Sequence, residues 1–283
     1  MERHVAGRAL TLRHAFEGDD GEDVITPSSA VTVIVTPVGA SSPVASGSAT
    51  SPTGASVAWT FTTPPLTEGV YTVEWDGGDG LRDTEYIEVA GRRIFTLRTF
   101  RKIEPDITVD RFSAARVSRA RQHVEDEFER ITGRSFIPVT RRVRIDADGR
   151  DAIWIGRFDT RRLVAMETLA GSPVDTSGLD LDQNGVLTGL SALRGSYVAT
   201  IAYGMLTVPG DVERAAILRA RTLLVNERGG VPDRATSFQP VEGGTYTLAT
   251  PGLGRWKTGI PDVDAVLAGY TYEIADALLE ALP

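Results

Sequence analysis

The sequence predicts an α+β protein of two domains: an antiparallel β-sandwich over residues 1–95 and a helical core with a strand-rich insertion over residues 96–283. Three observations predict this division. The first part alternates apolar and polar residues between turn formers, whereas the second carries apolar residues at helical spacing. The charge divides as well, because residues 1–95 carry −7 of the formal net charge of −8, and the remainder carries −1.

Short alternating runs, each bounded by Pro or Gly-rich turns, predict the strands of the first part. They are residues 31–35, 57–61, 70–75 and 84–89. The segment 39–54 is rich in Ser, Gly, Ala and Pro and is expected to be a loop. Short strands at this spacing are typical of an immunoglobulin-like sandwich.

Helical periodicity is strongest in Arg111 to Thr132, where Asp110 is the expected N-cap and Gly133 the expected C-terminal stop. A second helix is expected from about Asp211 to Asn226. A third is expected to begin after Pro261 and to extend as far as Leu282.

Between the first two helices, four runs predict the strand-rich insertion. They are residues 139–145, 152–155, 163–169 and 196–202, and the first two are expected to be joined by a turn at residues 146–149. Asp180 to Gly185 matches the first six positions of a calcium-binding loop, but Ser191 stands where that loop needs a bidentate Glu. A tight hairpin turn at Asn184-Gly185 explains the segment better.

Composition argues against most catalytic chemistry. The chain has no cysteine and only three histidines, His4, His14 and His123. His123 and Glu127 stand four residues apart, but no further ligand lies nearby in the sequence, so a solvated pair is the simpler interpretation. The glycine-rich segment 252–259 lacks the Gly before Lys257 that a phosphate-binding loop requires. We therefore expect no catalytic residue, no cofactor site and no metal site.

The expected environment is aqueous. No apolar run approaches a membrane span, and the N-terminal residues lack the apolar core of a signal peptide, so no membrane association is expected. An acidic chain is also a poor candidate for coating nucleic acid, because phosphate contacts need a basic surface.

The first helix has an unusual charge order. Its N-terminal half is basic and its C-terminal half acidic, the reverse of what the helix dipole favours. One hypothesis is that neighbouring subunits pair head to tail, basic half against acidic half. The alternative is a solvated face with incidental order. The interface candidates are Arg116, Arg119, Arg121, Glu125, Glu127 and Glu129.

Three ordered blocks resemble the head-to-tail connector (adaptor) proteins of tailed bacteriophages. The first is Ala120 to Pro138, ARQHVEDEFERITGRSFIP. The second comprises Val208 to Ala216 and, further along, Pro232 to Ser237. The third is Thr258 to Leu267, TGIPDVDAVL. The β module before residue 95 is similar to an N-terminal addition that some connectors carry.

This resemblance implies a structural virion protein in the neck, between capsid and tail, that assembles in the host cytoplasm. It would form a homo-oligomeric ring, commonly twelve-fold, that binds the portal protein and a downstream connector or tail protein. Genomic DNA would pass through the ring without sequence-specific binding. The C-terminal segment would dock on the portal, and its candidate residues are Tyr272, Ile274, Leu278, Leu279 and Leu282.

Two other classes of function remain open. The β module could recognise carbohydrate or a cell surface, which aromatic residues clustered on one face would favour. Trp59, Tyr71 and Trp75 instead alternate as core residues do. An enzyme is the third class, and no motif specifically supports it.

Overall fold

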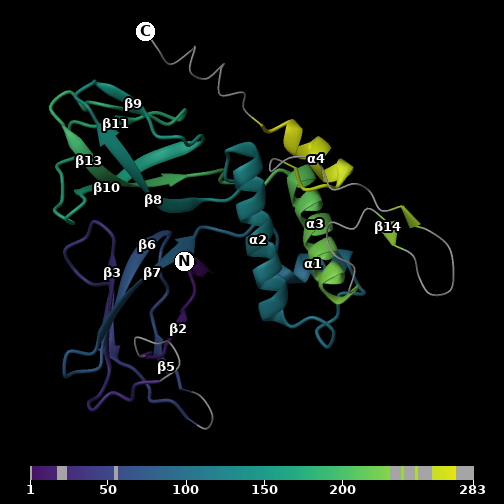
Figure 1. The fold of residues 1–283 in the computed structure, drawn as a ribbon, viewed down its shortest axis with the longest axis horizontal. Helices are drawn as coiled ribbons and strands as arrows, with labels where there is room; N and C mark the ends of the chain where they lie inside the picture. The colour runs from purple at the N-terminus through teal and green to yellow at the C-terminus, as the bar shows by residue number, and fades with distance from the viewer. Residues whose placement is uncertain are drawn as a thin grey trace.

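The computed structural model describes residues 2–17, 24–53, 57–229, 237–238, 246–247 and 257–271. It has the predicted α+β composition, with a β-rich N-terminal part on one side of a long central helix and further helices on the other (Figure 1).

The N-terminal part is built on a five-stranded sheet of order β1-β7-β6-β3-β4, with β2 and β5 forming a separate antiparallel pair. Its core includes Trp75 and Val73, which alternate with exposed residues as the sequence predicts. The bounds are β1 Glu2–Val5, β2 Thr11–His14, β3 Thr32–Pro37, β4 Ala45–Ser48, β5 Trp59–Thr62, β6 Gly69–Asp76 and β7 Arg82–Ala90.

Two features of this sheet differ from the prediction. Strand β4 lies inside the segment 39–54, which was expected to be a loop. Its residues ASGS have low strand propensity, but the backbone pairs with β3 from Thr32 to Val35. Strand β1 pairs in parallel with β7, Glu2 opposite Ile87, so the sheet is mixed rather than purely antiparallel.

The long central helix, α2 (Ala114–Thr132), follows a short helix, α1 (Leu97–Ile103). Helix α2 begins three residues later than predicted, because Ser113 rather than Asp110 is its N-cap and accepts a hydrogen bond from the backbone of Arg116. Phe112, just before the cap, is buried instead of helical. The helix ends at Gly133 as predicted, in the left-handed conformation (φ 72°).

Two three-stranded sheets form the insertion. The strands β8 (Val139–Ala147), β10 (Thr160–Thr168) and β13 (Gly195–Tyr203) make one sheet, with β13 in the centre. The other sheet contains β9 (Ala152–Trp154), β11 (Asp180–Leu181) and β12 (Val186–Thr188).

The turn predicted at residues 146–149 does not form a hairpin, because β8 pairs with β13 while β9 pairs with β12. The turn predicted at Asn184-Gly185 is confirmed. It joins β11 to β12, and Gly185 has a φ of 83°.

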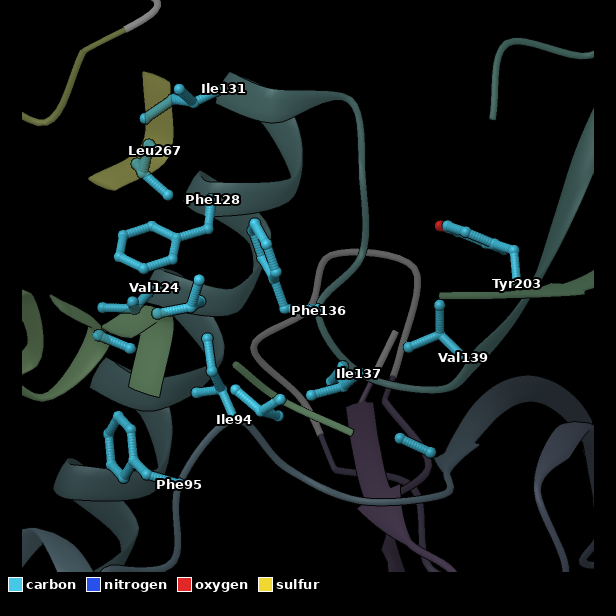
Figure 2. Packing of buried hydrophobic residues seen from close by; sticks show 14 of the residues in the cluster. Ile94, Phe95, Val124, Phe128, Ile131, Phe136, Ile137, Val139, Tyr203 and Leu267 are labelled. Carbon is cyan, nitrogen blue, oxygen red and sulfur yellow. The ribbon is translucent and has the colours of Figure 1, made fainter. Parts of the chain in front are cut away.

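Two further helices complete the described fold, α3 (Gly210–Gly229) and α4 (Pro261–Ala268), together with the short pair β14 (Ser237–Phe238) and β15 (Tyr246–Thr247). Both helices begin close to the predicted positions. Helix α4 ends at Ala268, so it does not continue unbroken toward Leu282 as expected. Helices α2, α3 and α4 pack together, and Figure 2 shows Phe128 of α2 facing Leu267 of α4 within the apolar core.

The buried apolar residues form two separate clusters, one from Leu10 to Val89 and the other from Ala90 to Leu267. The change occurs close to the boundary expected at residue 95, although the division into two domains stays a prediction. The two parts meet through polar contacts, among them a backbone hydrogen bond from Gly91 to Pro138 (3.0 Å) and an ion pair between Glu68 and Arg161.

Candidate functional site

A buried polar network centred on Arg3 joins the N-terminal strands to helix α2. The Arg3 guanidinium donates to three carboxylates: Nε to Glu88 at 2.9 Å, Nη1 to Glu125 at 2.8 Å and Nη2 to Asp126 at 2.8 Å. The side chains of Arg3, Glu88 and Glu125 are each only 2% exposed. Strands β1 and β7 are therefore joined to the middle of α2 by one guanidinium.

Glu125 is the most heavily used acceptor in this network. Its other oxygen, Oε1, accepts a hydrogen bond from the backbone nitrogen of Ile94 at 3.0 Å, and the Arg93 guanidinium lies 3.4 Å from Oε2. These contacts hold the segment between β7 and α1 against α2. A carboxylate can be buried this deeply only when hydrogen-bond donors contact its oxygens.

The arginines of this network differ in how well their charge is compensated. Burial alone would lower the pKa of Arg3, but the charges of Glu88 and Glu125 outweigh it and raise that pKa. For Arg121 burial prevails, and together with the nearby charge of Arg93 it lowers the pKa to about 10. The Arg121 guanidinium instead donates to the backbone oxygen of Phe95 at 3.0 Å.

A second set of contacts continues from the network to the sheet β10-β13-β8. Arg141 of β8 lies 3.2 Å from Glu129 and 3.4 Å from Asp126 of α2. The Tyr203 hydroxyl of β13 donates to the other oxygen of Glu129. Burial is the largest cause that raises the pKa of Tyr203, and the charge of Glu129 is the second. This phenol therefore stays protonated in the folded protein.

A shallow hollow of about 380 Å³ adjoins these contacts. Among the described residues its lining has two acidic side chains, three basic side chains and one glycine: Asp126, Glu129, Arg130, Arg141, Arg157 and Gly133. Because Arg141 and Glu129 already pair with each other, the hollow has little uncompensated charge with which to select a ligand.

The acidic half of α2 is also joined to α3. Both oxygens of Glu127 accept from the Arg219 guanidinium, at 2.8 and 3.0 Å, in the two-pronged geometry that favours arginine over lysine. The two side chains are 8% and 9% exposed. Helix α2 is therefore bonded to arginines of β1, β8 and α3.

The basic half of α2 has different surroundings. Together with α3 it forms a groove of about 540 Å³ whose lining residues are Arg116, Arg119, Ala120, His123 and Leu223. Ala120 and Leu223 contribute apolar side chains to this lining, Arg116 and Arg119 contribute guanidinium groups, and His123 contributes an imidazole. Arg119 and His123 are exposed, and the Arg116 guanidinium lies over the ring of Phe112, 5.7 Å from its centre.

These positions revise the interface hypothesis for α2. Arg121, Glu125 and Glu127 are buried and are bonded within the same chain, so they are not exposed to a neighbouring subunit. The charge order of the helix has an internal cause, since Arg3, Arg93 and Arg219 surround its acidic half. Arg119 remains exposed, and Arg116 and Glu129 remain partly exposed.

The other predicted residues divide into two groups. Tyr272, Ile274, Leu278, Leu279 and Leu282 lie outside the described residues, so their proposed docking role stays a prediction. Of the aromatic residues of the β module, Trp75 and Tyr71 are buried and Trp59 is partly buried. No structural observation therefore favours a carbohydrate-binding face built on them.

Sequence reasoning missed the arginines that pair with α2, chiefly Arg3, Arg93, Arg141 and Arg219. Their partners are 12 to 123 positions away, so no local pattern connects them. The available signal was compositional. Arginine accounts for 28 of the 30 basic residues, and arginine suits buried two-pronged pairing with carboxylates.

Among the described residues, no group of three or more His, Cys, Asp or Glu side chains is placed to hold a metal ion. Within the same residues, no helix is both long and apolar enough to cross a membrane.

The fold and this site define an α+β protein whose polar interior is an arginine–carboxylate network. No protein-family model matches the chain, and no curated protein matches it. One chain of a solved structure titled "Neck of empty GTA particle computed with C6 symmetry" is similar, with a TM-score of 0.34 and 17% identity. The match covers 44% of this chain and 72% of that chain. A likeness of this size assigns neither fold family nor function.

Proposed function

We propose that this protein is a structural subunit of a virion neck, a head-to-tail connector that assembles as a ring between portal and tail. The observation that carries the proposal is the set of three ordered sequence blocks that resemble such connectors. In the described residues these blocks fall on α2 and the segment that joins it to β8, on the start of α3, and on α4, whereas residues 232–236 lie outside the described residues. These three helices pack on one another, so the blocks belong to one structural unit.

The polar network supports a structural role. A subunit of a ring under load needs its elements held rigidly, and buried arginine–carboxylate contacts with matched donors fix orientation. Helix α2 is held in this way to β1, β7, β8 and α3 by Arg3, Glu88, Arg141 and Arg219. The same side chains are engaged with one another, which leaves them unable to serve as free acids or bases.

The charge distribution is compatible with a channel that DNA traverses. Residues 96–283 are nearly neutral, with 24 basic and 25 acidic side chains. Several of these arginines are paired with carboxylates within the chain. A surface of this kind does not hold phosphates strongly, so DNA would pass without sequence-specific binding.

The proposal includes the partners of the connector class: further copies of this chain in a ring, commonly twelve-fold, the portal protein, and a downstream connector or tail protein. The virion neck is the proposed location, with assembly in the host cytoplasm. No catalytic step, cofactor or metal is part of the proposed function.

Negative-stain electron microscopy of the full chain mixed with the portal protein of the same virion tests the proposal. We expect a closed ring attached coaxially to one end of the portal. A portal that remains bare at micromolar concentrations of this chain, while the chain is folded by circular dichroism, would reject the connector role.

A further inference from the structure

Arg121 of α2 is a buried cation whose guanidinium pairs with no carboxylate among the described residues. The residue is only 9% exposed, and its guanidinium donates to the backbone oxygen of Phe95 at 3.0 Å. Within the same part of the chain, the buried Nε atom of Arg121 has no hydrogen-bond partner. A neutral carbonyl oxygen satisfies one donor and leaves the positive charge uncompensated. Burial of such a charge is costly, because the protein interior solvates it poorly.

Arg93 brings a second positive charge to the same place. It is 8% exposed, and its guanidinium lies 3.4 Å from Glu125, which is one helical turn beyond Arg121 on the same face of α2. Glu125 is already bonded to Arg3 at 2.8 Å and to the backbone nitrogen of Ile94 at 3.0 Å. The Nε atom of Arg93 also lacks a hydrogen-bond partner in the described chain. One carboxylate therefore faces three buried guanidinium groups.

The neighbouring segment adds positive charge and no negative charge. Residues 91–103, GRRIFTLRTFRKI, contain five basic residues and no acidic one. Arg92 and Arg98 of this segment are exposed on either side of the buried residues Ile94 and Phe95. Burial, and then the charge of Arg93, lower the pKa of Arg121 to about 10, the direction expected where nearby anions do not balance the cation.

We propose that Arg93 and Arg121 bind a small oxyanion, which supplies the missing negative charge. Guanidinium groups present paired N–H donors that match the oxygens of phosphates and carboxylates. Because both residues are more than nine-tenths buried, only a slender group reaches them, and the backbone of a DNA duplex does not. Two sources have the required chemistry: a free phosphate ion, and a carboxylate side chain of a neighbouring copy. The site does not depend on the connector role.

Thermal unfolding of the full chain in increasing inorganic phosphate tests the site. Sodium phosphate replaces sodium chloride at constant ionic strength and neutral pH, so that screening stays the same. We expect the Tm of wild type to rise and to saturate in the millimolar range, as binding to one site does. Exclusion of phosphate from protein surfaces also raises the Tm, but that effect does not saturate and is common to all variants.

Two variants with the same substitution isolate the site. Arg121→Met should raise the phosphate concentration at half-saturation about tenfold or more, because a charge-assisted contact is lost. Arg119→Met is the matched control, since Arg119 is exposed on the same helix, and it should respond as wild type does. Isothermal titration calorimetry of the folded proteins gives a second measurement that is independent of unfolding. It should show one phosphate per chain for wild type and Arg119→Met, and weaker binding for Arg121→Lys.

Protein concentration distinguishes the two sources of the oxyanion. A saturating phosphate response that is equal at low and high micromolar protein identifies a free ion. A Tm that rises with protein concentration in phosphate-free buffer, and that Arg121→Met but not Arg119→Met makes constant, identifies a carboxylate of a neighbouring copy. Equal phosphate responses of wild type and Arg121→Met, with no dependence on protein concentration in either, would overturn the inference.

Discussion

Arg3 and Glu125, separated by 122 positions in the sequence, are joined by a hydrogen-bonded ion pair of 2.8 Å in which both side chains are 2% exposed. This contact connects the first strand of the β module to the central helix of the other part. Burial this complete means that the pair is not screened by solvent, so each partner depends on the other.

Replacement of Arg3 by Met should strongly destabilise the protein. The substitution leaves both carboxylates buried with only more distant arginines to compensate their charge. Arg93 lies 3.4 Å from Glu125, and Arg141 lies 3.9 Å from Glu88. Loss of one partner of a buried pair costs about 3–5 kcal/mol. We expect a decrease of about 3 kcal/mol in the free energy of unfolding, measured by urea denaturation. Arg8→Met is the control, because Arg8 is exposed on the same segment, and an equal loss in the two variants would contradict the account.

The Glu127–Arg219 pair should show strong coupling in a double-mutant cycle. Glu127→Leu leaves the buried Arg219 guanidinium without its carboxylate, and Arg219→Met leaves the buried Glu127 carboxylate without its guanidinium. Each substitution should therefore lower the free energy of unfolding by about 3 kcal/mol. The double variant removes both charges and should cost less than either single variant. Strictly additive effects in guanidinium chloride denaturation would show that the pair does not join α2 to α3. Asp148→Ala, at the exposed Arg150–Asp148 pair, should leave the midpoint unchanged.

Tyr203 should make the protein sensitive to alkaline pH. In the folded state burial and Glu129 keep this phenol protonated, whereas in the unfolded chain it ionises near pH 10. A raised pKa of this kind contributes stability below pH 10 that is lost as the pH rises further. Between pH 9 and 11, wild type should therefore lose about 1 kcal/mol more than Tyr203→Phe, as followed by urea midpoints. Parallel pH profiles for the two proteins would exclude this role, since every other tyrosine is common to both.

The contact of the β module with the second part should be sensitive at Gly39. This residue has a φ of 85°, and a β-carbon there would lie only 2.5 Å from the Cβ of Ala165 in β10. Gly7 also has a positive φ, of 76°, but a β-carbon added at Gly7 would have no atom within 4 Å. Gly7→Ala should cost about 1 kcal/mol through backbone strain alone.

Gly39→Ala should cost about 1–3 kcal/mol more than Gly7→Ala, because the close approach adds to the strain. Differential scanning calorimetry of the two variants measures this difference. An equal shift in Tm would indicate that the β3–β4 loop does not contact β10 in solution.

Sequence patterns within a few residues predicted the helices and turns that such short stretches determine. The apolar stripe from Val117 to Ile131 and the glycine at 133 were sufficient for α2 and its end, and Asn184-Gly185 was sufficient for its hairpin. The start of α2 was misplaced because two capping residues, Asp110 and Ser113, compete within one turn, and burial of Phe112 decides between them.

The site was less accessible to sequence reasoning. The order of charges on α2 is unusual, and from the sequence it suggests either pairing with a neighbouring subunit or a solvated face with incidental order. In the structure the acidic half of α2 pairs with arginines of the same chain, which tertiary packing brings there: Arg3 by the parallel pairing of β1 with β7, Arg141 by β8, and Arg219 by the packing of α3. Pairing over such sequence separations leaves no periodic signal.

Native mass spectrometry of the purified full chain, alone and with its portal protein, tests the connector proposal most directly. The account predicts a discrete closed oligomer that forms at low salt or on addition of portal. Monomers under every condition, including a molar excess of portal, would contradict it.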